Sequence, residues 1–96
     1  MIIGTLEVEL DIDHAQSLKD KRAVLNRVKT RVRNKFNVSI AEVGGNELWN
    51  YACLGIAIVS NDQKHCNRVL DKVLTHIEEV GDCVLADYCM EFVNLG

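Results

Sequence analysis

The spacing of the hydrophobic residues changes in a fixed order along this chain, and that order limits the fold more than any other feature. Residues 2–12 alternate between apolar and polar side chains, which is the period of a half-buried strand. From Ser17 to about Phe36 the apolar residues instead recur at helical spacing, which predicts a helix capped by Ser17 with Asp20 three residues later. The apolar stripe of this helix contains Leu18, Leu25, Val28, Val32 and Phe36.

The middle of the chain predicts two further strands with a break between them. Residues 37–43 are rich in β-forming side chains, and residues 51–60 form the nearly continuous apolar run of a central strand. The segment Gly44–Asn46 interrupts the pattern. Residues 47–50, around Trp49, are expected to form a helical turn before the third strand.

The last third of the chain predicts a second helix and a final strand. Asn61 or Asp62 caps a helix that runs to about Val80, Gly81 is placed to end it, and residues 83–93 follow as a strand. The order βαββαβ with right-handed crossovers predicts a ferredoxin-like α+β sandwich, in which a four-stranded antiparallel sheet carries both helices on one face. With no linker composition in 96 residues, we expect one domain covering residues 1–96.

The basic residues are concentrated in the first helix. Eight of the eleven lie there: Lys19, Lys21, Arg22, Arg27, Lys29, Arg31, Arg33 and Lys35. Only Asp20 opposes them, so this segment carries a formal charge of +7, while three basic and thirteen acidic residues elsewhere carry −10. The net charge of −3 therefore hides a separation of charge that suits a surface for a polyanion.

One side of this helix predicts a nucleic-acid interface. At 100° per residue its polar side chains fall within about 80° of one another, along roughly 20 Å of helix. They are Lys19, Arg22, Asn26, Lys29 and Arg33. Such a stripe can follow successive phosphates, and arginine adds bidentate contacts. The alternative interpretation is an ordinary solvated helix face.

The start of the same helix is a second candidate, for anion binding. Free backbone N–H groups after Ser17, together with Lys21, would suit a phosphate. The alternative is that Ser17 and Asp20 already cap these groups. No glycine-rich loop precedes the helix, so a P-loop or dinucleotide site is not supported.

Other features give little support for catalysis. The open face of the sheet is expected to be acidic and to lack aromatic residues, so it does not suit the base stacking used by many RNA-binding domains of this shape. His14 has no nucleophile paired with it by sequence, and a small phosphate-chemistry enzyme using Ser17 and His14 is the least favoured hypothesis. We expect no catalytic residue and no cofactor.

The four cysteines are expected to be free thiols. Cys53, Cys66, Cys83 and Cys89 match no zinc-binding spacing, so no metal site is predicted. The N-terminus lacks the pattern of a signal peptide, and no apolar run is long enough to cross a membrane. We therefore expect a cytoplasmic protein with no membrane partner.

Five blocks of the sequence resemble the YlxP-like family of small uncharacterised bacterial proteins. They are Gly4–Leu10, Ser17–Arg22, Arg33–Gly44, Leu48–Trp49 and Leu54–Asn61. The resemblance covers essentially the whole chain and implies a ferredoxin-like fold. It also implies, by association with neighbouring genes for ribosome maturation and translation initiation factors, a role near the ribosome. It implies no catalytic residue.

Two functional hypotheses follow. The first is a non-enzymatic RNA-binding or ribosome-associated module, with ribosomal RNA or a ribosomal subunit as partner. The second is a homodimeric protein-interaction module without nucleic-acid binding. Its surface would be the edge of the second strand, the Leu48–Trp49 segment, or the basic helix against an acidic patch of another copy.

Overall fold

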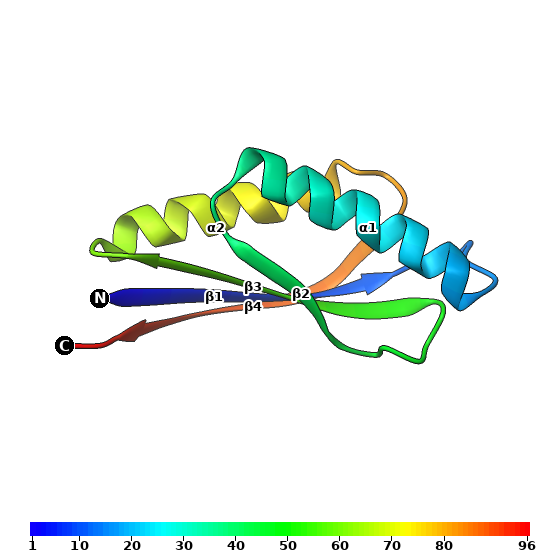
Figure 1. Cartoon of the computed structure of the whole chain (residues 1–96), viewed down its shortest axis with the longest axis horizontal. Helices are drawn as coiled ribbons and strands as arrows, with labels where there is room; N and C mark the ends of the chain where they lie inside the picture. Colours follow the sequence, from blue (N-terminus) through cyan, green and yellow to red (C-terminus); the bar gives the residue numbers. More distant parts are fainter.

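The computed structural model of the protein describes residues 1–96 and contains four strands and two helices (Figure 1). The elements are β1 (Ile2–Asp11), α1 (Leu18–Lys35), β2 (Ser39–Gly44), β3 (Tyr51–Ser60), α2 (Gln63–Glu78) and β4 (Val84–Asn94). The strands form one antiparallel sheet in the order β2-β3-β1-β4, and both helices cover the same face. The predicted ferredoxin-like α+β fold is confirmed.

The alternation in β1 and the apolar run of β3 have different structural causes. Leu6, Val8 and Leu10 of β1 are fully buried beneath the helices, while the residues between them face the open side of the sheet. In β3, Leu54 and Ile56 are buried in the same way, but small residues such as Gly55 and Ala57 occupy the open face. The two strands pair over their whole lengths at the centre of the sheet.

The predicted cap of α1 is confirmed. The Ser17 hydroxyl accepts a hydrogen bond from the Asp20 backbone N–H at 3.1 Å, and the Asp20 carboxylate accepts one from the Gln16 N–H at 3.0 Å. Of the predicted apolar stripe of α1, Leu25, Val28 and Val32 are buried, while Leu18 and Phe36 are half-buried. The buried face also contains Val24 and one charged residue, Lys21, which the predicted stripe did not include.

The second helix begins at the second of its two predicted caps. The Asp62 carboxylate accepts a hydrogen bond from the Lys64 N–H at 2.9 Å, which satisfies a free donor of the first turn. The helix ends at Glu78, slightly earlier than predicted, and Gly81 follows with φ of 86°. Neither helix combines the length and the apolar composition needed to span a membrane.

The predicted helical turn at residues 47–50 is wrong. The Leu48 N–H instead donates to the Gly45 carbonyl at 2.9 Å, which closes a single tight turn between β2 and β3. Gly45 enters this turn with φ of 72°, and a Cβ atom there would lie 2.5 Å from the Tyr51 ring. The tight turn is therefore set by glycine conformation and by packing against β3, neither of which is a helical signal.

Candidate nucleic-acid interface

The structure keeps the predicted polar stripe together on one side of α1. Lys19, Arg22, Asn26 and Arg33 are exposed, and Lys29 is half-buried. The Arg33 guanidinium donates to the Ile40 carbonyl at 3.0 Å, so this side of the helix faces β2. On the opposite side, Arg27 donates to the Asp82 carboxylate at 2.9 Å.

Arg33 has two roles in this arrangement. One N–H group hydrogen-bonds to a carbonyl of β2, which holds the end of the stripe against the sheet. The other guanidinium donors have no partner within the protein, and arginine carries five in all. The side chain can therefore anchor the helix and still contact a phosphate.

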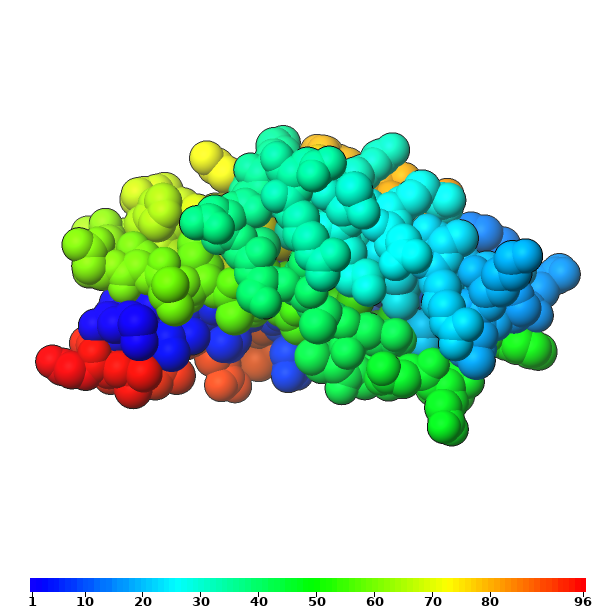
Figure 2. Space-filling model, in the orientation of Figure 1, coloured from blue at the N-terminus to red at the C-terminus, as the bar shows by residue number.

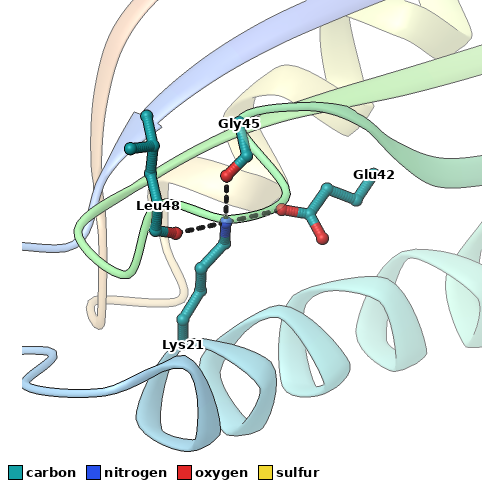
Figure 3. Close-up of polar contacts among 4 residues, drawn as sticks. All are labelled: Lys21, Glu42, Gly45 and Leu48. Carbon is teal, nitrogen blue, oxygen red and sulfur yellow. Dashed lines mark hydrogen bonds and ion pairs between the residues drawn. The ribbon is translucent and has the colours of Figure 1, made fainter.

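Lys21 does not belong to the interface, contrary to the interpretation of the helix start as an anion site. The residue is only 1% exposed. Its ammonium group lies 2.6 Å from the Gly45 carbonyl, 2.6 Å from the Leu48 carbonyl and 2.7 Å from the Glu42 carboxylate (Figure 3). Two of its N–H donors are used on the two carbonyls, and its charge is paired with Glu42 in a buried position, so the group is not available to a bound anion.

The other half of the predicted anion site is also occupied. Ser17 uses its hydroxyl to cap the Asp20 N–H, and Asp20 lies at the helix start with its carboxylate on the Gln16 N–H. Ser17 and Lys21 therefore do not form an open anion-binding site. Sequence spacing contained a signal for the burial of Lys21, because positions 18, 21, 25, 28 and 32 follow the apolar stripe.

The open face of the sheet is acidic, as expected, but it does carry an aromatic residue. Tyr51 pairs with Asp11 across the open face, and its hydroxyl donates to the Glu9 carboxylate at 2.8 Å. The prediction of no aromatic residue on this face is wrong, because the helices cover only one face of β3 and Tyr51 lies on the other. The carboxylates on this face are Glu7, Glu9, Asp11, Asp87 and Glu91. They would repel an RNA backbone, so phosphate contacts are expected on α1.

Tyr51 gives a prediction about alkaline stability. Its hydrogen bond to Glu9, helped by partial burial and nearby negative charge, raises the pKa of Tyr51 from 10.0 to about 12. The stabilisation should be complete below about pH 10, where the phenol is protonated in both states, and should be lost as the pH rises through about 12. The measurement is tyrosinate absorbance as a function of pH. The difference between the protein and its Tyr51→Phe variant gives the titration of Tyr51 alone. Glu9→Gln should move it toward 10, and an unmoved titration would contradict the assigned cause.

The four cysteines and His14 are the remaining potentially reactive side chains. All four cysteines are free thiols, and Cys66 is buried in the core. Burial first, then the carboxylates of Glu7 and Glu9, raises the pKa of Cys53, which disfavours its nucleophilic thiolate. His14 is exposed in the turn after β1 and makes no hydrogen bond or ion pair. No three His, Cys, Asp or Glu side chains lie close enough together to hold a metal ion.

Comparison with known sequences identifies relatives of the chain. Residues 3–90 match the model of a family described as protein of unknown function, DUF503. The chain is also 48% identical over 77 residues to the uncharacterized protein YlxP of Bacillus subtilis strain 168, an alignment covering 80% of this chain and 84% of that protein. These relatives agree with the resemblance seen in the five sequence blocks.

Comparison with solved structures shows the fold alone. A de novo designed protein with a ferredoxin fold is similar with a TM-score of 0.63 at 14% identity, covering 100% of this chain and 89% of that one. The ACT domain of GTP pyrophosphokinase from Chlorobium tepidum is similar with a TM-score of 0.53 at 14% identity, covering 95% and 96%. At such low identity, neither likeness carries information about a ligand.

Proposed function

Because the chain belongs to the DUF503 family of proteins of unknown function, we propose its function from its own surface: a non-enzymatic RNA-binding module that contacts phosphates through α1. The observation that carries this proposal is the exposed stripe on the β2 side of α1, on a molecule whose remaining charge is strongly acidic. The proposed contact residues are Lys19, Arg22, Asn26, Lys29 and Arg33. Ribosomal RNA or a ribosomal subunit is the proposed partner, in keeping with the YlxP-like resemblance.

The distribution of charge also orients the RNA. The stripe covers fifteen residues of helix, which is about 20 Å and room for several successive phosphates. The acidic face of the sheet lies on the other side of the molecule from the helices (Figure 1). Repulsion from that face and attraction to α1 both direct an RNA backbone to the helical layer.

The test is binding to ribosomal RNA and to purified ribosomal subunits over a range of salt. With four cations in contact, the logarithm of the binding constant should fall with the logarithm of salt concentration with a slope of about −3 to −4. Selective binding to one subunit that persists at about 0.15 M salt supports the proposal. Loss of all binding at that salt would mean that the helix is a generic electrostatic surface, and would refute the assigned function.

A homodimeric interaction module is the second candidate, and an observation about the sheet edges favours it. The outer edge of β2 is short, bulged and in part covered by Arg33 of α1. β4, by contrast, is eleven residues long, has a neighbouring strand on one side only, and exposes Val84, Tyr88 and Val93. The edge favoured for a second copy is therefore β4, rather than the second strand or the Leu48–Trp49 segment.

Light scattering over a range of protein and salt concentrations tests this second candidate. Pairing of β4 with a second β4 brings together carboxylates such as Asp87 and Glu91, so the dimer should strengthen as salt increases. A dimer in which the basic helix of one copy binds the acidic face of the other would instead dissociate more readily as salt increases. Val93→Lys should dissociate a β4 dimer, while Val59→Lys at the end of β3 should not. A monomer under all conditions would eliminate the candidate.

A further inference from the structure

The loop that carries Trp49 is anchored on both sides of that residue. The Leu48 carbonyl, immediately before Trp49, accepts a hydrogen bond from the buried Lys21 ammonium at 2.6 Å (Figure 3). The Asn50 carbonyl, immediately after it, accepts one from the Ile12 N–H at 2.9 Å. The loop backbone is therefore hydrogen-bonded to α1 just before Trp49 and to the end of β1 just after it. These two contacts fix the position of the Trp49 backbone.

The Trp49 side chain itself is left outside the core. The residue is 52% exposed, and its indole N–H has no partner in the protein. A tryptophan buries a large apolar area when it packs fully, and about half of the Trp49 surface is left open to solvent instead. A rigid aromatic surface with a free polar edge is instead typical of a binding residue.

The anchored loop lies beside the start of the proposed phosphate-binding stripe. Lys21, which holds Leu48, is adjacent in sequence to Arg22, an exposed member of the stripe. Figure 2 shows the first turns of α1, in blue to cyan, and the green loop around residue 48 at the same end of the molecule. A backbone that follows the stripe toward Lys19 therefore runs toward the end of the molecule that holds the loop carrying Trp49.

From this juxtaposition we propose that the bound RNA is single-stranded, and that one of its bases stacks on Trp49 while its phosphates lie along α1. The inference rests on the RNA-binding function proposed above and names the class of RNA. Unpaired bases can leave the stack and lie on an aromatic ring, whereas the bases of a duplex cannot. Asp20 and Glu47 are exposed near this end of the helix and offset part of the positive charge of Lys19 and Arg22, so stacking on Trp49 would add affinity there.

The experiment compares a twelve-nucleotide single-stranded RNA with a hairpin duplex of the same strand at low salt. Trp49 is the only tryptophan, so its fluorescence reports stacking directly, while anisotropy of labelled RNA reports affinity. We expect tighter binding of the single strand and quenching of Trp49 that saturates with it. Trp49→Ala should weaken single-strand binding by about five- to hundredfold and leave duplex binding unchanged, and Trp49→Phe should retain most of the affinity.

Leu48→Ala is the matched control, because Leu48 is equally exposed in the same loop and uses only its backbone to hold Lys21. It should leave RNA binding unchanged. Equal losses in Leu48→Ala and Trp49→Ala would overturn the stacking role, because loop conformation would then carry the effect. Equal affinity for single strand and duplex, with Trp49 unquenched, would overturn the inference and leave the RNA-binding function standing. No binding of either RNA would overturn both.

Discussion

Replacing Lys21 with methionine should lower the free energy of unfolding by about 3 kcal/mol, because it breaks a buried ion pair and leaves its partners unsatisfied. Methionine is an unbranched apolar side chain of similar length, so most of the loss comes from the missing ammonium group. Without it, the Glu42 carboxylate keeps its charge in a site that is only 19% exposed. The carbonyls of Gly45 and Leu48 also lose their donor.

Urea denaturation followed by circular dichroism measures this change. Lys19→Met and Arg22→Met, on the exposed side of the same helix, are the controls and should change the free energy of unfolding by less than about 0.5 kcal/mol. Adding Glu42→Gln to Lys21→Met should recover part of the loss, since no uncompensated charge then remains. A loss below about 1 kcal/mol for Lys21→Met would contradict the structural role assigned to this residue.

Replacing Arg22, Lys29 and Arg33 together with alanine should weaken RNA binding by about a hundredfold at low salt, because three phosphate contacts are lost. The slope of the binding constant against salt should become shallower by about 2 to 3 for the same reason. The measurement is the proposed titration with ribosomal RNA, repeated at several salt concentrations. Arg33→Ala also removes the hydrogen bond to Ile40, so the unfolding midpoint must be measured alongside.

The matched control for this triple variant lies on the opposite side of α1. Replacing Arg27, Arg31 and Lys35 with alanine changes the net charge by the same amount but leaves the stripe intact. RNA binding should then change little. If both triple variants weakened binding equally, net charge rather than the stripe would be responsible, and the assignment of the interface to the β2 side of the helix would be wrong.

The sequence predicted the fold well because the signals that it used are local. Alternation in β1, helical spacing in α1 and α2, and the caps Ser17 and Asp62 all depend on residues a few positions apart. The bounds of the predicted elements differ from those observed by only a few residues. The concentration of basic residues on one helix was visible in the same way.

The roles of particular residues depended on contacts between distant segments. Lys21 belongs to the basic cluster by composition, yet its partners lie more than twenty residues later, and only those contacts show that its charge is buried. The apolar run that contains Tyr51 predicts a buried strand, and only the pairing of β3 with β1 places this residue on the open face. The anchoring of Trp49 beside α1 likewise requires both Lys21 and Ile12.

The sequence by itself determined the order of elements, the layer in which the positive charge lies and the family. The tertiary structure decided which of those charges are buried and which loop lies at the same end of the molecule as the start of the stripe. The physical reason is that periodicity and capping act within one segment, whereas burial and hydrogen-bond satisfaction arise only when segments pack against each other.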